Sequence, residues 1–458
     1  MTLIFGASQP TILPEHANQR SSIPADVRVT MVDMSESVHP PVQRGPGHRL
    51  LRMTGRDPHE PHRSATPLEL LFDLTFVVAI GQASSQLAHL LAEGHVASGL
   101  TAFGFSMFAI CWAWINFSWF ASAYDTDDWF YRITTMVQMI GVLVLALGLP
   151  AVFHSVDEGE HLDNGIVVAG YVIMRIAMVA QWLRAAKDDP ARRRVALSYA
   201  GFITLAQIGW IALAWADPSI GTVFLVAPLL YLIELGGPVV SEARYGDTGW
   251  HPHHIAERYG LLTIIALGEG VFGTVASVSA VVEKQGWSSE AILLVVAGIG
   301  LTFGLWWNYF VLPSGPMLAR YRRRSWVWGY GHIVVYASIA ATGAGLHVAA
   351  YLIEGVAQIG VFGAVLAVAV PVLVFCASLF VLYSLLVGEF DTFHISLFAG
   401  TVIVLAVAAV LAATGASLGL CLLVVTAAPA VIVIGYEALG YRHQAAVLAR
   451  ALGERVRE

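Results

Sequence analysis

Twelve apolar stretches, each long enough to cross a lipid bilayer, follow one another along this chain of 458 residues. A helix needs about 20 mostly apolar residues to do so, because lipid offers no hydrogen-bond partner to backbone groups outside a helix. Hydrophobic residues make up 57% of the chain and charged residues 12%, which excludes an ordinary soluble domain. We predict an all-α, polytopic membrane protein. The predicted membrane helices are 68–91, 98–122, 131–153, 164–184, 194–216, 220–240, 258–280, 288–312, 326–352, 358–385, 394–414 and 417–438.

The basic residues predict how these helices are oriented. With the N-terminus in the cytoplasm, all but two of the 25 Lys and Arg residues fall on the cytoplasmic side; Lys284 lies outside and Arg175 lies within a helix. This bias follows the positive-inside rule, so we expect both termini to be cytoplasmic. Because the charge is segregated by side, the net charge of −7 gives no reason to expect nucleic acid as a partner. The basic loops favour contact with the lipid bilayer.

A segment of the chain occurs nearly twice. Residues 69–82 (ELLFDLTFVVAIGQ) resemble residues 257–269 (ERYGLLTIIALGE), and a second pair of matched segments follows at 114–117 and 307–310. The copies are six predicted helices apart and therefore cross the membrane in the same direction, which is typical of parallel repeats in transporters. We predict two six-helix halves, 67–244 and 245–438.

The two ends of the chain differ from these halves. Residues 1–66 are rich in Pro, Arg, His and Ser without an apolar period, which predicts a disordered cytoplasmic tail. Residues 439–458 form a cytoplasmic C-terminal tail, either as a short interfacial helix or as a solvated segment. The three cysteines sit in different apolar stretches without a metal-ligand spacing, so we expect no disulfide or zinc site.

Three motifs in order identify a resemblance to a known family. They are residues 68–80, residues 112–120 leading into the acidic run at 125–128, and residues 254–269. Together they resemble the bacterial low temperature requirement A family over nearly all of 66–440. The resemblance implies a multi-helix protein of the bacterial cell (inner) membrane and supplies no substrate. The acidic run lacks an Arg and a Pro that the family often carries there.

Glu269 is the first candidate for a functional residue. It lies about 11 residues into 258–280, which is about 16 Å along a helix and near the middle of the membrane. An unpaired carboxylate at this depth costs several kcal/mol, so it is typical of an ion pathway, although a protonated packing residue is the alternative. Gly268, Gly270 and Gly273 spell a G-x-G-x-x-G pattern without the preceding strand of a dinucleotide site. We expect these glycines to allow close packing or local opening of the helix.

Two carboxylates begin the first repeat. Glu69 and Asp73 are four residues apart and share a helix face, where they repel each other unless a base, a proton or a cation lies between them. Glu69 alone is explained by the helix dipole, so Asp73 is the better functional candidate. Gln82 follows the glycine of its repeat as Glu269 does, and Leu261 stands where the first repeat has Asp73. The broken symmetry points to Glu269.

Other polar residues fall inside predicted helices. Glu234 lies in 220–240 and Arg175 in 164–184, so three buried acids, Asp73, Glu234 and Glu269, face one base. Excess acid of this kind favours proton or cation coupling. Asn116 and Asn308 occupy the second matched segments; they either hydrogen-bond across the repeat axis or line a solute path.

No signature of a bound metal or cofactor stands out. His254 and Glu257 share the i, i+3 spacing of two metal ligands, but further ligands are missing and histidines before a helix are more often interfacial. We expect no metal and no cofactor. No nucleophile–base pair is recognisable either, so we do not expect an enzyme.

These observations favour a proton- or cation-coupled transporter of a small solute. An ion channel of the two-repeat type is the alternative, and a membrane sensor or enzyme of unknown reaction is the third. The expected partners are the bilayer and an unidentified ion or solute, with a homo-oligomer left open.

Overall fold

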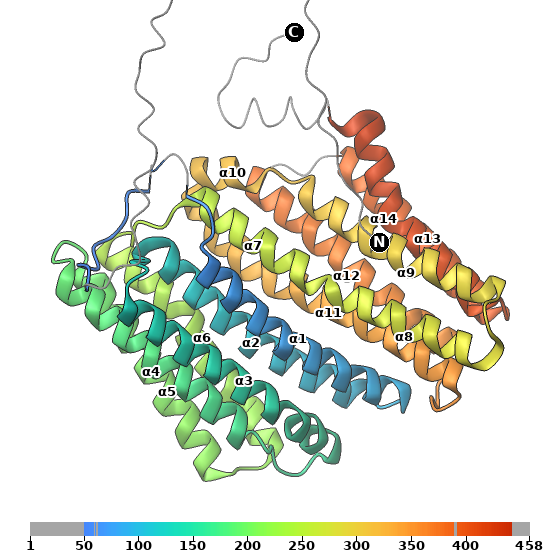
Figure 1. Ribbon diagram of the computed structural model, residues 1–458, viewed down its shortest axis with the longest axis horizontal. Coiled ribbons are helices and arrows are strands. Elements are labelled where there is room, and N and C mark those ends of the chain that lie inside the picture. Colours follow the sequence, from blue (N-terminus) through green and yellow to red (C-terminus); the bar gives the residue numbers. More distant parts are fainter. Residues whose placement is uncertain (1–49, 59, 61–62, 389–391, 442–458) are drawn as a thin grey trace, which may run out of the picture. The chain divides into compact units, whose positions relative to one another are not determined.

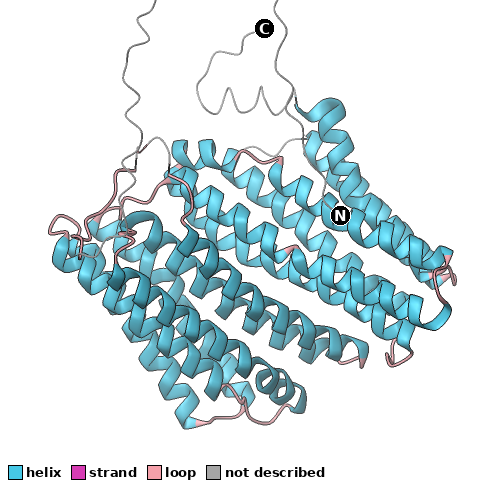
Figure 2. Ribbon diagram, in the orientation of Figure 1, coloured by secondary structure: helices cyan, strands magenta, loops and turns pink. Residues whose placement is uncertain are grey.

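A computed structural model describes residues 50–58, 60, 63–388 and 392–441. In that part of the chain the secondary structure is helical, and 12 helices are long and apolar enough to cross a membrane (Figure 2). The predicted all-α membrane fold and its number of spans are confirmed. Residues 1–49 and 442–458, which hold most of both predicted tails, lie outside the described residues.

The helices follow one another with short connections (Figure 1). They are α1 (Pro67–Ala92), α2 (Val96–Tyr124), α3 (Trp129–Glu158), α4 (Gly165–Asp188), α5 (Arg193–Ala216), α6 (Ile220–Tyr245), α7 (Pro252–Ala266), α8 (Gly268–Gln285), α9 (Ser289–Phe310), α10 (Ser314–Arg320), α11 (Ser325–Glu354), α12 (Val361–Val387), α13 (Thr392–Ala413) and α14 (Leu418–Gly435). A 3₁₀ turn (Arg322–Arg324) precedes α11, and a π-helical turn (Tyr436–Gly440) follows α14. Helices α7 and α8 together form one span, Pro252–Gln285.

Helix α11 is the most buried span. It packs against α1, α8 and α12. Of its apolar 18-residue segment 78% is buried, compared with 44% of the corresponding segments of α1 and α12. Small residues on α11 make this packing possible: a Cβ added to Gly343 would lie 2.7 Å from the Cβ of Glu269, and one added to Gly345 would lie 2.3 Å from a backbone oxygen of α12. The core of the helix bundle therefore forms where α1 and α8 both meet α11.

The two predicted halves have a similar internal order of neighbours. In each, the first span packs against the second and third, the third against the fourth, and the last two against each other. The contact between halves runs mainly through α1 and α11 (Figure 1). The duplication itself stays a prediction.

The span predicted at 258–280 begins six residues earlier in the structure. Pro252 occupies the first turn, and the ring of His251 accepts a hydrogen bond from the backbone N–H of His254 as the helix cap. Pro at the first position and a side-chain cap are typical of helix starts. Consequently His254 and Arg258, which were predicted to lie at or before the membrane boundary, lie inside a helix with completely buried side chains.

Part of the segment predicted to be a disordered tail is packed on the helices. The backbone N–H groups of Leu51, Met53 and Gly55 donate to the carboxylates of Asp128, Asp188 and Asp189, at 3.1, 3.1 and 3.0 Å. Met53 is fully buried. The structure therefore differs from the prediction for the described residues between 50 and 66, because three carboxylates at helix ends fix this backbone in place.

Candidate functional site

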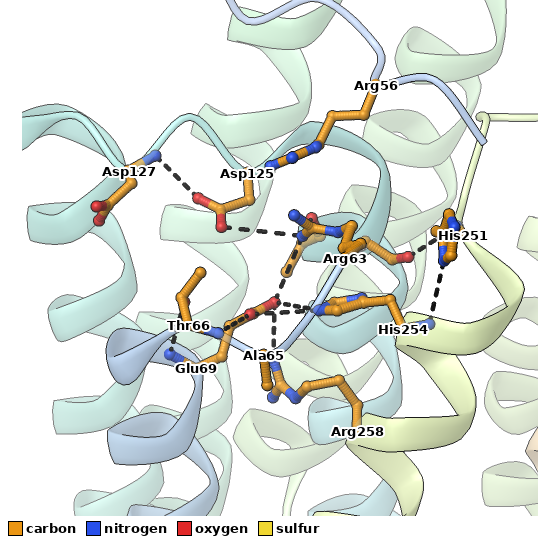
Figure 3. Close-up of polar contacts among 12 residues, drawn as sticks. Arg56, Arg63, Ala65, Thr66, Glu69, Asp125, Asp127, His251, His254 and Arg258 are labelled. Atoms are coloured by element: carbon orange, nitrogen blue, oxygen red, sulfur yellow. Dashed lines mark hydrogen bonds and ion pairs between the residues drawn. The ribbon is translucent and has the colours of Figure 1, made fainter. Parts of the chain in front are cut away.

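Among the described residues, the four acids predicted for an ion pathway lie in three separate buried groups. The first, which we call the inner cluster, consists of Arg63, Glu69, Asp73, Asp125, His254 and Arg258 at the start of α1. Figure 3 labels all of these except Asp73. The second surrounds Glu234 between α2, α4, α5 and α6. The third is Glu269 at the start of α8.

Arg258 lies between the two carboxylates of α1. Its guanidinium is 2.9 Å from an oxygen of Glu69 and 2.5 Å from Oδ1 of Asp73, and all three side chains have no exposed surface. Asp73 also accepts a hydrogen bond of 2.7 Å from the indole of Trp114. The base that the repelling pair of carboxylates required is therefore supplied by α7, from the other half of the chain.

The rest of the inner cluster surrounds Glu69. His254 Nε2 lies 3.2 Å from Glu69 Oε1, and Arg63 Nη2 lies 3.8 Å from both Glu69 Oε1 and Asp125 Oδ2 (Figure 3). Thr66 and Glu69 form a capping box, in which each side chain accepts the other's backbone N–H, and this fixes the start of α1. The inner cluster thus joins the N-terminal segment, α1 and α7.

Two groups of the inner cluster lie outside the helices and carry shifted pKa values. Burial and the nearby charge of Glu69 raise the pKa of Asp125 to about 6, against an opposing effect of Arg63. Burial also lowers the pKa of Arg63 from its ordinary value, although Glu69 favours its charged form. Buried charges shift in this way when their partners do not fully replace water.

The Glu234 group is also ion-paired. Arg175 Nη2 lies 3.2 Å from Glu234 Oε2 and 2.6 Å from the hydroxyl of Tyr171. The indole of Trp112 donates to Oε2 of the same carboxylate and the indole of Trp210 donates to Oε1, the latter at 3.2 Å. One acid and one base thus neutralise each other inside a shell of aromatic donors.

Glu269 has a different environment. It is 8% exposed and lies 17 residues from the first residue of a 34-residue span, which is its middle. The helix tightens just before it, because the N–H of Gly270 bonds to the carbonyl of Leu267 only three residues back. Within the described residues no Lys, Arg or His forms an ion pair with Glu269; the polar group beside it is the hydroxyl of Ser84. The helix therefore has a local irregularity at this carboxylate, a tighter turn and not the opening that was the second expectation.

Glycines of two other helices make room for the Glu269 side chain. A Cβ added to Gly81 of α1 would lie 2.6 Å from Glu269 Oε1, and Gly343 of α11 meets its Cβ. Gln82, the residue after Gly81, is half-buried. The carboxylate therefore lies in the packed contact between the two halves.

The two predicted asparagines, Asn116 and Asn308, have different surroundings. The amide of Asn116 donates to the Trp112 carbonyl of its own helix at 2.8 Å. Asn308 is buried, makes no conventional hydrogen bond among the described residues, and lines a cavity of about 60 Å³ with Cys376, Tyr383 and others. The structure therefore shows no amide pair across a repeat axis.

The structure places neither metal candidate in a ligand set. His254 faces Glu69 within the inner cluster, whereas Glu257 is exposed and accepts a bond of 3.3 Å from the N–H of Ala65. In the described part of the chain no group of three His, Cys, Asp or Glu residues is arranged to hold a metal ion.

The two arginines of the inner cluster, Arg63 and Arg258, were not predicted as site residues from the sequence. Arg258 was counted among the cytoplasmic bases and Arg63 among the residues of a tail. A signal for Arg258 was present: two acids on one face of a buried helix need a base, and Arg258 is the only basic residue in the second copy of the repeated segment. No comparable signal marks Arg63.

Comparisons with known proteins agree with the motifs. A family model described as bacterial low temperature requirement A protein matches residues 64–429. A protein of Rhizobium meliloti (strain 1021), described only as uncharacterised, is 25% identical over 302 residues, which are 60% of this chain and 67% of that protein. No solved structure matches significantly.

Proposed function

The chain belongs to the bacterial low temperature requirement A family, and from that premise we propose that it is a proton- or cation-coupled transporter of small solutes. Its place would be the bacterial inner membrane, with both termini in the cytoplasm, as the distribution of basic residues predicts. Glu269 would carry the coupling proton or bind the coupling cation.

The observation that carries this proposal is the isolation of Glu269. Its carboxylate lies at mid-span, at a local irregularity of the helix, where α1 and α11 meet α8. Ionisable residues at such depth typically mark ion pathways or proton relays when they are not held by a fixed partner. The other three carboxylates predicted for an ion pathway, Glu69, Asp73 and Glu234, are each held by an arginine.

A proton-flux measurement tests the proposal. Protein is reconstituted into liposomes that contain a pH-sensitive dye, and lumenal pH is followed after addition of sodium, potassium, or a panel of amides and polyols. We expect at least one solute to drive proton movement through the wild type. Glu269→Gln should abolish that movement, whereas Glu283→Gln, an exposed carboxylate at the end of the same span, should not.

Two outcomes count against the proposal. One is equal solute-driven proton movement in the wild type and Glu269→Gln; the other is none in the wild type across the whole panel. Unitary currents without coupling to a second gradient would instead identify an ion channel.

A further inference from the structure

The exposed face of α1 changes from apolar to polar halfway along the helix. Residues 74, 78, 82 and 86 are four apart and therefore lie on one face. In the half of α1 next to the inner cluster this face carries Leu74 and Val78, which are 55% and 54% exposed, as is typical of a surface in contact with lipid. In the other half it carries Gln82 and Gln86, both partly exposed. Gln82 lies about 15 Å before the last residue of α1, so the change falls near the middle of the membrane.

Several polar side chains in this outer half have no partner in the protein. Within the described residues, no side-chain hydrogen bond is made by Gln82, Ser85 and Gln86 of α1 or by His347 of α11, and all are partly exposed. In lipid, a polar group without a partner costs several kcal/mol. Unpaired polar side chains in a membrane span therefore face water or the protein interior, and the exposure of these side chains favours water.

Glu269 lies at the inner end of these polar faces. A Cβ added to Gly81 of α1 would lie 2.6 Å from Glu269 Oε1, and one added to Gly343 of α11 would lie 2.7 Å from its Cβ. Ser85 follows Gly81 by four residues, and His347 follows Gly343 by four, so each lies about one helical turn further out on the same face. The carboxylate thus contacts both helices at the point where their polar faces begin.

The two polar faces meet again at the outer end of the bundle. His89 follows Ser85 by four residues, and Tyr351 follows His347 by four. The rings of His89 and Tyr351 stack at 5.0 Å between centroids, and His89 Nε2 lies 3.3 Å from the Tyr351 hydroxyl. His89 is exposed and lies three residues before the end of α1. We call the polar side chains between Glu269 and this contact the outer polar seam; they are Gln82, Ser85, Gln86 and His89 of α1 and His347 and Tyr351 of α11.

The seam does not continue past Glu269 toward the inner cluster. On α11, Ile339 and Val335 lie four and eight residues before Gly343, and both are completely buried apolar side chains. On α1, the ion pairs of the inner cluster fix the beginning of the helix. Polar, partly exposed side chains therefore lead from Glu269 in one direction, toward the end of the bundle predicted to lie outside the cell.

We propose that the outer polar seam is a water-accessible path through which the coupling proton or cation reaches Glu269 from the outer side of the membrane. In this structure the path is closed toward the cytoplasm by the apolar side chains of α11 and by the inner cluster. The inference rests on the proposed function for the moving species and for the orientation of the chain. The accessibility of the seam can be measured without transport.

Labelling of single cysteines tests the path. The three native cysteines are buried, so the wild type is the unlabelled reference. Gln82→Cys and Gln86→Cys are treated with a membrane-impermeant cationic methanethiosulfonate, applied to intact cells or to inverted membrane vesicles. A thiol reacts as the thiolate, which forms where water reaches it, so we expect both variants to react from the outside at least roughly tenfold faster than Val78→Cys. Val78 is the matched control, because it lies on the same face in the inner half.

A second pair of variants tests whether the path ends at Glu269. Glu269→Cys should also react from the outside. Ser85→Trp added to Glu269→Cys should slow this reaction severalfold, because the indole fills the seam one turn further out. Leu147→Trp, at a side chain of α3 that is 77% exposed, is the control and should leave the rate unchanged.

The proposal is overturned if Gln82→Cys and Gln86→Cys do not react from the outside, which is the result if lipid or a second copy of the chain covers this face. It is also overturned if they react only from the cytoplasmic side, if Val78→Cys reacts as fast, or if Ser85→Trp leaves the labelling of Glu269→Cys unchanged. Since no gradient or solute is used, these results are independent of the flux measurement. A labelled seam with normal flux in Glu269→Gln would keep the path and remove the proposed function.

Discussion

Helix α1 contacts two buried carboxylate sites that are built in opposite ways. Near its start, Glu69 and Asp73 are fixed by Arg258, with further contacts from His254 and Trp114. About two turns further along, Gly81 leaves room for Glu269, which has a hydroxyl beside it but no ion pair within the described residues.

The difference distinguishes carboxylates that stabilise the fold through an ion pair from a carboxylate that is free to bind a proton or a cation. The two charges of a buried ion pair hold each other in place, and removal of one of them lowers the free energy of unfolding by several kcal/mol. A buried carboxylate without a base can instead take up a proton or a cation at small structural cost. We therefore interpret the inner cluster as a structural contact that joins the two halves. We interpret Glu269 as the group that takes up and releases a proton or a cation. Four predictions test this distinction through the free energy of unfolding, measured by SDS titration in mixed micelles.

Removal of Arg258 should have the largest effect. Arg258→Met leaves two fully buried carboxylates without their base, so we expect a loss of about 3–5 kcal/mol. The triple variant with Glu69→Gln and Asp73→Asn removes the uncompensated charges as well and should recover most of this loss. Arg323→Met, at an exposed arginine, is the control. If Arg258→Met behaves as the control does, the inner cluster is no joint.

The Glu234 pair should follow with a smaller loss. Glu234→Gln keeps the shape of the side chain and leaves Arg175 with the hydroxyl of Tyr171, so we expect a loss of about 2–3 kcal/mol. Because the two charges compensate each other, the double variant with Arg175→Met should lose less than the sum of the single losses. Strict additivity would show that the pair is not coupled in the membrane.

The spans could be predicted because their cause is local. Length and apolarity decide whether a segment crosses the bilayer, and both are read directly from sequence. The start of the seventh span was not predicted because its cause is not local. His254, Glu257 and Arg258 lower the hydropathy of this segment, although two of the three are buried. Their burial depends on Glu69 and Asp73, which lie more than 180 residues earlier. Hydropathy cannot register charges that compensate each other across a fold.

The candidate site was predictable to the same extent. The depth of Glu269 and the glycines beside it are local features, and the sequence identified both. The pairing of Arg175 with Glu234, and of Arg258 with Asp73, arises only from the packing of helices distant in the chain. The sequence therefore indicated too few buried bases, and it could not show which of the acids are held by an arginine.

The third prediction concerns Asp125, at the edge of the inner cluster, and the pH dependence of the free energy of unfolding. Its pKa is raised to about 6 in the folded protein, by burial first and then by Glu69, whereas an unfolded Asp has a pKa near 3.8. The folded state therefore holds this proton more tightly, and its contribution to stability is complete below pH 4 and lost as pH rises through 6. We expect a loss on the order of 1–3 kcal/mol over this window.

Asp125→Asn carries no such proton and should flatten this part of the pH profile. Its amide oxygen can still accept the N–H of Asp127 as the wild-type carboxylate does, so the local turn is retained. Asp127→Asn, at an exposed neighbour, is the control and should keep the wild-type slope. A wild-type slope in Asp125→Asn would show that Arg63 fully compensates this carboxylate.

Glu269→Gln should have the smallest effect on stability and the largest on transport. No base within the described residues is left unpaired by the change, and an amide is less costly to bury than a charge. We expect the free energy of unfolding to stay within about 1 kcal/mol of the wild type or to rise, in contrast with Arg258→Met. Solute-driven proton movement should disappear in the same variant. A loss of several kcal/mol in the free energy of unfolding would instead show that Glu269 is ion-paired as Glu69, Asp73 and Glu234 are. Neutralising a buried carboxylate destabilises the fold by this much only when it leaves a charged partner unpaired.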